Sequence, residues 1–308
     1  MADSENDQQL PAALRRERML ALIDDHGFAR VGELGETFGV SDVTVRADLD
    51  ELDRQKAIRR VHGGAVIRSR HLRAEPTFEQ AIGASADEKA TIGLLAAMLV
   101  QTGQSVLLDV GSTALAVAES LVARVARGEL ADVVVITNGL SIALALEPGV
   151  VAGGLTVIVS GGTLRPQQHS LVEPLASSML RGLHADLAFI GCNGVDGAFG
   201  VTNVNLPEAQ VKRVMLESAS RSVVVADRSK LGQVHLGTVG ALAEFDALVT
   251  GPAPVTATPA PGRDAVAAVA ALTALAAPGR DAALDALADA LDRAGLLVIT
   301  DPATAACF

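Results

Sequence analysis

Residues 41–55, Ser-Asp-Val-Thr-Val-Arg-Ala-Asp-Leu-Asp-Glu-Leu-Asp-Arg-Gln, decide the fold of the first part of this 308-residue chain. Within them Val45, Leu49 and Leu52 recur at the i, i+4, i+7 spacing of one buried helix face. Ser41 suits the N-cap, because its hydroxyl can accept a hydrogen bond from a free backbone N–H. The stretch therefore predicts a helix that begins at about residue 42 and ends at about residue 55.

The sequence on either side of this helix predicts two more helices and a hairpin. Apolar stripes over 12–25 and over 31–38, the second ended by Gly39, each favour a short helix. Residues 57–67 hold two β-prone stretches around Gly63-Gly64, which is the pattern of a β-hairpin. Three short helices followed by a basic hairpin are the layout of a winged helix-turn-helix, here over 12–67, after an N-terminus that we expect to be disordered over 1–11.

These residues also carry a family resemblance. Arg15, Met19 and Ile23, followed by the stretch 41–49, resemble the helix-turn-helix signature of DeoR-type bacterial repressors. Arg59 with His62-Gly63-Gly64-Ala65 resembles the wing of the same family. One departure is Ala47, which stands where a basic residue is common in the family.

The winged helix-turn-helix implies that the third helix enters the major groove of double-stranded DNA. Arg46 is placed to bind a guanine edge or a phosphate, and Val43 and Ala47 to touch a thymine methyl. Asp48 is expected to hold local structure, because a carboxylate facing a phosphate is unfavourable. The candidate DNA-contacting residues are Ser41, Asp42, Val43, Thr44, Arg46, Ala47, Arg54, Arg59, Arg60, His62, Gly63 and Gly64.

The charge of the chain is unevenly spread. The formal net charge is −11, of which residues 1–73 carry −1 and residues 74–308 carry −10. Residues 54–73 nevertheless hold seven cations and no acid. Such a strip indicates an electrostatic partner, although a solvated linker explains the charge alone equally well.

Composition excludes several classes of function. Aromatic residues are 2% of the chain, with no Tyr or Trp, so binding by stacked bases is disfavoured. Two cysteines, Cys192 and Cys307, cannot build a disulfide framework or a Cys-rich zinc site. The chain has no Walker A or GxGxxG motif, no apolar signal core, and no apolar run long enough to span a bilayer. We therefore expect a cytoplasmic protein without cofactor, metal ion or membrane partner.

From residue 85 the chain alternates aliphatic strands with helices. A capping box, with Ser85 at the N-cap and Glu88 at N3, is expected to open the first helix. Uninterrupted aliphatic strands separated by helices predict an α/β domain over 85–308, with a mostly parallel sheet covered on both faces. Residues 68–84 are expected to be a linker. The strands are predicted at 105–110, 133–137, 155–160, 186–191, 222–227, 247–250 and 296–300.

Polar residues follow the ends of these strands, where parallel sheets bind ligands. Gly111-Ser112-Thr113 offers free N–H groups, two hydroxyls and a positive helix end, which suit a phosphate, although such a turn is more often only a helix start. Glu208 and Lys212 lie four apart on one helix face, for which a surface ion pair is the commoner interpretation. His169 and Cys192 show no partner in the sequence and are interpreted as structural.

Residues 88–250 resemble the sensor domain of the DeoR family. The resemblance implies a fold similar to ribose-5-phosphate isomerases and coenzyme A transferases, and binding of a phosphorylated sugar or related metabolite. Gly111, Ser112 and Thr113 would take the phosphate, whereas Glu173 stands where the family often has Gly. The other candidate effector-binding residues are Asp109, Asn138, Gly161, Gly162, Asn193, Gly194, Asp196, Glu208, Lys212 and Lys230.

An Ala- and Pro-rich stretch over about 252–281 falls outside this resemblance and is expected to be an insertion. For the whole chain the sequence predicts a repressor of a carbohydrate-metabolism operon, bound to a double-stranded operator as a homodimer or homotetramer and released by a phosphorylated sugar. The alternative is a phosphosugar isomerase or transferase-like enzyme, since Asp196, Glu208 and Lys212 could move protons. A third interpretation is a protein-interaction module with a degenerate winged helix.

Overall fold

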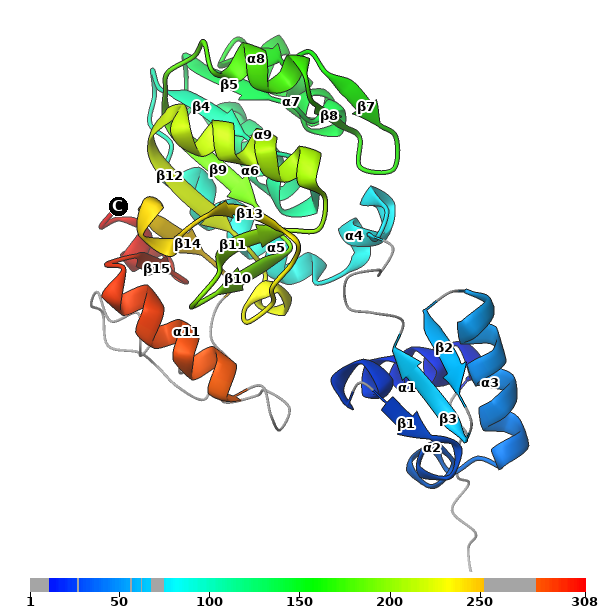
Figure 1. The fold of residues 1–308 in the computed structure, drawn as a ribbon. Helices are drawn as coiled ribbons and strands as arrows, with labels where there is room; N and C mark the ends of the chain where they lie inside the picture. Colours follow the sequence, from blue (N-terminus) through cyan, green and yellow to red (C-terminus); the bar gives the residue numbers. More distant parts are fainter. Residues whose placement is uncertain (1–10, 27, 56, 62, 68–74, 252–280) are drawn as a thin grey trace, which may run out of the picture. The chain divides into compact units, whose positions relative to one another are not determined.

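The computed structural model describes residues 11–26, 28–55, 57–61, 63–67, 75–251 and 281–308 (Figure 1). The chain divides into two compact units, Met1–Glu75 and Pro76–Phe308. Each unit has a hydrophobic core of its own. Within the described ranges, no helix combines the length and the apolar character needed to cross a membrane.

The first unit is the predicted winged helix-turn-helix. Its apolar core holds Met19, Ile23, Leu34, Val45 and Leu49, all fully buried, so the helix faces expected from the sequence are confirmed at these residues. Leu14, which the stripe over 12–25 also includes, is 39% exposed. A third strand, which the sequence did not predict, pairs with the hairpin in the order β1-β3-β2. The elements are α1 (Ala12–His26), β1 (Phe28–Arg30), α2 (Val31–Phe38), α3 (Asp42–Arg54), β2 (Ile58–Val61) and β3 (Gly64–Ile67).

The glycines of the hairpin have structural reasons to be there. Gly63 has a φ of 81°, in the left-handed region that favours glycine. A Cβ on Gly64 would lie 2.3 Å from the carbonyl oxygen of Ala29, so only glycine lets β1 approach β3 this closely. The hairpin geometry therefore accounts for both glycines without a ligand.

The second unit is built on seven parallel strands in the order β15-β14-β12-β9-β4-β5-β6. One apolar core lies on each face, so the prediction of a doubly covered α/β sheet is confirmed. The strands are β4 (Ser105–Leu108), β5 (Val133–Thr137), β6 (Leu155–Val159), β9 (Ala185–Gly191), β12 (Ala219–Val225), β14 (Ala247–Val249) and β15 (Leu297–Ile299).

Helices cover the two faces of this sheet (Figure 1). On one face lie α8 (Leu175–Leu180), α9 (Leu206–Glu217) and α11 (Asp281–Arg293). On the other lie α5 (Ala86–Met98), α6 (Ser112–Ala126), α7 (Leu140–Val151) and α12 (Pro302–Ala305). α5 and α6 pack closely at Gly93, where a Cβ would lie 2.4 Å from the Ala116 carbonyl oxygen.

Short elements that the sequence did not predict join the main sheet. β7 and β8 form an antiparallel hairpin, and β10, β11 and β13 form a small antiparallel sheet. Two single-turn helices, η2 and η3, come before and after β13. All have three or four residues, too few to show a periodicity. Their bounds are β7 (Thr163–Arg165), β8 (Ser170–Val172), β10 (Gly194–Asp196), β11 (Gly200–Asn203), β13 (Gly237–Gly240), η2 (Arg228–Lys230) and η3 (Leu242–Glu244).

Two expectations around residue 80 are wrong. The expected linker contains α4 (Phe78–Gly83), which a capping box between Thr77 and Gln80 opens, and which belongs to the second unit. The expected capping box at α5 is absent: Ser85 has a φ of 53° and makes no side-chain cap, while Glu88 accepts from the backbone N–H of Arg228 at 2.9 Å. The predicted insertion lies outside the described residues except at its last position, where α11 begins.

Candidate DNA-binding surface and effector site

The outer face of α3 carries the side chains expected to meet DNA. Ser41 caps the helix by accepting from the backbone N–H of Thr44 at 3.3 Å, as its position predicts. Val43 is 73% exposed, and Arg46 and Ala47 are exposed beside it. Arg46 makes a 3.5 Å ion pair with Asp42 in which both side chains are more than half exposed. This weak pair leaves the guanidinium accessible to an incoming partner.

Asp48 points the other way, into the unit. Its carboxylate accepts from Arg15 at 2.7 Å and from Arg16 at 3.3 Å, and its side chain is 5% exposed. These contacts tie α3 to α1. The carboxylate therefore fixes the position of the recognition helix, as the sequence suggested.

The cations in and next to the wing differ in their exposure and in their ion-pair partners. Arg59 is exposed, but Arg60 donates to the Arg46 carbonyl at 3.2 Å and pairs with Asp50, so it joins the wing to α3. Its expected phosphate contact would require giving up these partners. Arg54 is 76% exposed and pairs with Glu51. His62 lies outside the described residues, as do most of the other cations of the 54–73 strip.

Sequence reasoning missed one cation of this surface. Arg30 is exposed at the end of β1 and lines a surface hollow together with Arg46, Arg60 and Gly63. The hollow lies where the start of α2, the start of α3 and the wing meet. The only signal in the sequence was a basic residue directly before a helix start.

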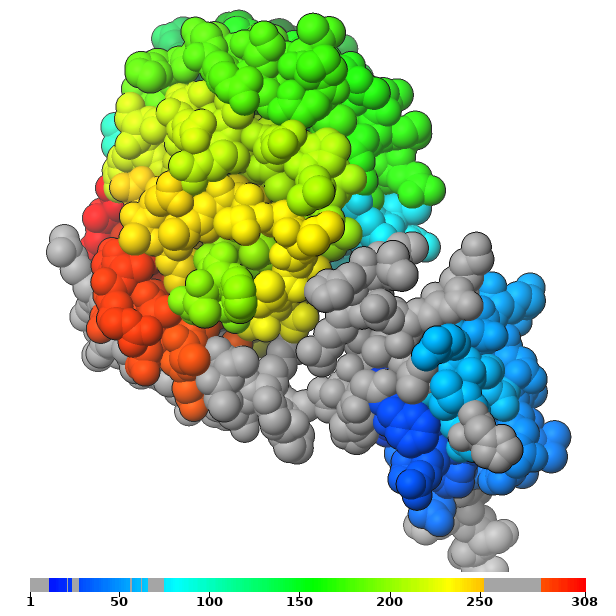
Figure 2. Space-filling view, in the orientation of Figure 1, coloured from blue at the N-terminus to red at the C-terminus, as the bar shows by residue number. Residues whose placement is uncertain are grey.

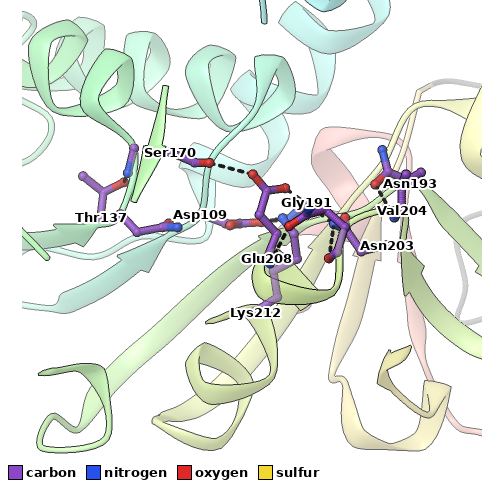
Figure 3. Close-up of polar contacts among 12 residues, drawn as sticks. Asp109, Thr137, Ser170, Gly191, Asn193, Asn203, Val204, Glu208 and Lys212 are labelled. Atoms are coloured by element: carbon purple, nitrogen blue, oxygen red, sulfur yellow. Dashed lines mark hydrogen bonds and ion pairs between the residues drawn. The ribbon is translucent and has the colours of Figure 1, made fainter. Parts of the chain in front are cut away.

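The second cluster lies at the carboxyl ends of the sheet strands (Figure 3). Asp109 follows β4, and its Oδ2 accepts from the backbone N–H of Gly191 at 2.9 Å and pairs with Lys212 of α9. Asp109, Glu208 and Lys212 are 1%, 4% and 3% exposed. The interpretation of Glu208 and Lys212 as a surface ion pair is therefore wrong, because the shared face of α9 is turned inward against the sheet.

The buried charges perturb one another's pKa values. Burial raises the pKa of the Asp109 carboxyl, against the opposing effect of the Lys212 ammonium. Burial alone would lower the pKa of Lys212, but Asp109 and Glu208 outweigh it and hold that pKa above its usual value. Burial likewise opposes ionisation of Glu208, and Lys212, Ser170 and Arg165 together still keep its pKa below 4.5. Burial raises the pKa of the Cys192 thiol to about 12, which leaves it inert.

The β7–β8 hairpin and β11 contribute residues that sequence reasoning missed. Ser170 donates to Glu208 Oε1 at 2.6 Å, Arg165 pairs with the same oxygen, and Asn203 lies 3.5 Å from Oε2. On the molecular surface the green segment that holds the hairpin lies beside the yellow-green α9 (Figure 2). No sequence signal marks these three residues, because their contacts with Glu208 exist only in the folded chain.

The start of α6 has no side-chain cap. Gly111 has a φ of 103°, and Ser112 and Thr113 stand half-buried at the positive end of this helix. Nearby, Asn138 donates to the Leu171 carbonyl at 3.0 Å. Asp109 Oδ1 and Asn138 Oδ1 are buried and have no hydrogen-bond partner among the described residues. Buried acceptors of this kind need a donor.

Several other predicted effector residues make structural contacts. Asp196 accepts from the backbone N–H groups of residues 198 and 199 at 2.8 and 3.0 Å, which caps the β10–β11 turn. Asn193 accepts from Val204 at 3.0 Å, and a Cβ on Gly194 would lie 2.2 Å from the Gln233 carbonyl oxygen. A Cβ on Gly162, whose φ is 151°, would lie 2.6 Å from the Val172 carbonyl oxygen. Gly161 is exposed, and Lys230 is half-buried in η2.

The contacts of His169 agree with its interpretation as a structural residue, although the sequence did not show its partners. Its Nδ1 lies 2.6 Å from Ser141 Oγ, its Nε2 lies 3.3 Å from Glu79, and its ring is 5.1 Å from that of Phe78.

Comparison with known families agrees with this architecture. A family described as the DeoR C terminal sensor domain matches residues 84–252, and one described as the DeoR-like helix-turn-helix domain matches residues 15–71. The chain belongs to the DeoR family of transcriptional regulators. Its helix-turn-helix implies DNA binding, and its sensor domain implies an effector.

Several curated regulators are similar over most of their length. The putative aga operon transcriptional repressor of Escherichia coli O157:H7 is 34% identical over 223 residues, which is 72% of this chain and 80% of the relative. The regulator GolR of Listeria innocua is 30% identical over 239 residues, 77% of this chain and 89% of the relative. The glycerol-3-phosphate regulon repressor of Escherichia coli K12 is 27% identical over 243 residues, 79% and 92% of the two chains. These relatives are transcriptional regulators, which decides against the enzyme interpretation.

Among solved structures, ribose 5-phosphate isomerase A of Methanocaldococcus jannaschii aligns with a TM-score of 0.36 and 21% identity. The alignment covers 48% of this chain and 55% of that one.

Proposed function

We propose that this protein is a repressor of a carbohydrate-metabolism operon, released from its operator by a phosphorylated sugar. The observation that carries the proposal is a buried polar cluster at the strand ends beside an uncapped helix start, in a unit separate from the exposed face of α3. The names of two relatives, an aga operon repressor and a glycerol-3-phosphate regulon repressor, support a link to this kind of metabolite.

The chemistry of the cluster favours a ligand that is an anion at one end and a hydroxyl donor at the other. The free N–H groups at the start of α6 and the hydroxyls of Ser112 and Thr113 suit a phosphate. The buried oxygens Asp109 Oδ1 and Asn138 Oδ1 would accept from sugar hydroxyls. Since Lys212 and Arg165 are already matched by two carboxylates, the helix start supplies the positive potential for the phosphate.

A ligand can release DNA only if it binds the DNA-free conformation more tightly than the DNA-bound one. Helix-turn-helix proteins usually read paired half-sites as symmetric oligomers, and we include a homodimer or homotetramer in the proposal. Light scattering of the full chain, with and without DNA, measures this oligomeric state.

The test combines ligand binding with DNA release. The full chain is used to select DNA from a random library, and a panel of sugar phosphates is then screened by thermal shift and by displacement of the selected DNA. The matching unphosphorylated sugars serve as controls. We expect at least one sugar phosphate to raise the melting temperature and to release DNA, while its unphosphorylated form does neither.

A variant that combines Ser112→Ala and Thr113→Ala sharpens the assignment of the phosphate. It should bind the selected DNA like the parent but require at least about a hundredfold more sugar phosphate for release, since two hydrogen bonds to a charged group, about 1.5 kcal/mol or more each, are lost. A panel that never releases DNA would contradict the proposal. Turnover of a panel member would revive the enzyme interpretation, and absence of sequence-selective DNA binding would favour the interaction module.

A further inference from the structure

The β7–β8 hairpin is attached to the polar cluster at two places: Leu171 exchanges hydrogen bonds with Asn138, and both strands contact the carboxylate of Glu208. Arg165 and Ser170 are paired residues in the register of the hairpin and flank its turn. Ser170 is fully buried and donates to Glu208 Oε1 at 2.6 Å, and Arg165 pairs with the same oxygen. Glu208 therefore holds both strands of the hairpin at the point where the turn begins.

The turn itself holds the first residues of the sensor unit. The Gln167 carbonyl accepts from the backbone N–H of Phe78 at 2.8 Å, and Gln168 Nε2 donates to the Pro76 carbonyl at 2.8 Å. His169 adds a contact between its Nε2 and the Glu79 carboxylate at 3.3 Å and a ring contact with Phe78, which is 5% exposed. Figure 1 shows the turn reaching α4. Three consecutive residues of the turn therefore contact residues 76–79, the first residues after the chain leaves the DNA-binding unit.

The far end of α4 has a second attachment to the strand ends. The buried Lys89 donates to the carbonyls of Ala81 and Ala84 at 2.6 and 2.5 Å, where α4 ends. Its neighbour Glu88 accepts from the backbone N–H and the guanidinium of Arg228, at 2.9 and 3.1 Å, just beyond β12. Both ends of α4 are therefore connected to residues that follow sheet strands.

We propose that the β7–β8 hairpin and α4 form the device that transmits effector binding to the DNA-binding unit. The inference rests on the proposed function, because it assumes that a ligand occupies the strand-end cluster. A ligand hydroxyl bound at Asp109 Oδ1 alters the ion pair between Asp109 and Lys212, and Lys212 in turn acts electrostatically on Glu208. Glu208 fixes the two residues that flank the turn. A displaced turn changes its bonds to 76–79, which directly follow the chain segment from the first unit. This supplies the differential contact that ligand control requires.

Hydrogen–deuterium exchange of the full chain without ligand tests the site end of this device. In Glu208→Gln, we expect the Phe78 amide to exchange at least about fivefold faster than in the parent, since its acceptor lies in the loosened turn. The matched control is Glu244→Gln, which also removes a carboxylate paired with an arginine of α9, Arg213. This control should leave the Phe78 amide within about twofold of the parent. An unchanged Phe78 amide in Glu208→Gln, or an equal effect of the control, would overturn the proposal.

A double variant at the other end covers the case in which Glu208→Gln does not fold. Glu79→Gln with Gln168→Ala removes two surface contacts between the turn and the 76–79 segment. We expect inorganic phosphate, and the sugar phosphate found active on the parent, to give the parental thermal shift. Release of DNA by that sugar phosphate should weaken by at least about fivefold, because binding and release are uncoupled.

The outcomes separate the two proposals. If the double variant releases DNA like the parent, the proposed transmission through the β7–β8 hairpin and α4 is wrong, and the proposed function is unaffected. If no sugar phosphate releases DNA from the parent, the proposed function fails, while the exchange measurement on the ligand-free chain still decides whether Glu208 and α4 are coupled.

Discussion

The two candidate sites differ in where they keep their charges. On α3, Asp42 and Arg46 are both more than half exposed, and their pair is loose at 3.5 Å. In the sensor unit Asp109, Glu208 and Lys212 are all less than 5% exposed and in direct or shared ion pairs. An exposed cation can exchange its partner for a DNA phosphate at little cost, whereas buried charges are part of what holds the fold.

This difference suits the two tasks. DNA binding should depend strongly on salt and only weakly on the stability of the unit, because its charges meet water in the free protein. A ligand that binds beside the buried cluster changes the surroundings of structural ion pairs, so its binding is tied to conformation. The predictions below test this contrast, beginning with the buried charges.

Lys212→Met should be the most destabilising substitution. It leaves Asp109 buried without its cation, and breaking one side of a buried pair costs about 3–5 kcal/mol of the free energy of unfolding. Urea denaturation measures it. Asp109→Asn combined with Lys212→Met should cost less than Lys212→Met alone, because no uncompensated charge remains. A cost below about 1 kcal/mol for the single variant is the value of a solvent-exposed ion pair. It would contradict the difference between the buried charges of the sensor unit and the exposed charges of α3.

Asp48→Asn should show that the DNA-binding unit also has a buried charge. Its carboxylate accepts from Arg15 and Arg16, and loss of hydrogen bonds to a charged group costs about 2 kcal/mol. Asp50→Asn is the matched control, since that carboxylate is 71% exposed in its pair with Arg60. Hydrogen exchange of the core amides reports the thermal unfolding of residues 1–75 within the full chain. Asp48→Asn should lower the temperature of this unfolding, and Asp50→Asn should not.

Glu208 should make the free energy of unfolding fall as the pH is lowered into the acid range. Its pKa in the folded chain lies below its usual value of 4.5, so its contribution to stability is present above about pH 4.5 and is lost as the pH falls through the folded pKa. Glu208→Gln should therefore lose less stability than the parent between pH 5 and 3. Asp109 acts in the opposite direction, because burial raises its pKa and favours its protonated form. A steeper acid loss in Glu208→Gln would contradict this assignment.

The recognition helix could be predicted almost completely from the sequence. Its buried face, its cap at Ser41 and the inward role of Asp48 depend on residues within one helix and its neighbour. The strand-end location of the buried polar cluster was also predictable, because parallel sheets place strand ends along one edge.

The rest depended on tertiary contacts between distant segments. Glu208 and Lys212 look like a surface pair until the fold brings Asp109, 103 residues earlier, against them. The prediction of a capping box at Ser85 was wrong because Glu88 instead accepts a hydrogen bond from Arg228, 140 residues away. Arg165 gave no sequence signal, since a three-residue strand is too short to show a period.

Arg46→Ala should weaken selective DNA binding with little effect on stability. Loss of a contact to a guanine edge costs about 1–3 kcal/mol of discrimination between the selected DNA and a scrambled duplex. Arg46→Lys keeps the charge but not the planar fork, so it should retain affinity for the scrambled duplex and lose selectivity. Competition binding of both duplexes measures the ratio. If Arg46→Ala weakens both duplexes equally, Arg46 binds phosphate and not a base.

Arg54→Ala should give the smallest effect, visible only in the salt dependence. If each protomer neutralises about four phosphates, the logarithm of the binding constant falls by about 3.6 per protomer for each tenfold rise in salt. Removing one phosphate contact should lower that slope by about 0.9, while the unfolding midpoint stays unchanged because the Arg54–Glu51 pair is exposed. Arg59→Ala should lower the slope equally, and Arg60→Ala should lower it less, since Arg60 already holds Asp50 and the Arg46 carbonyl. An equal drop for all three would mean that Arg60 releases α3 when DNA binds.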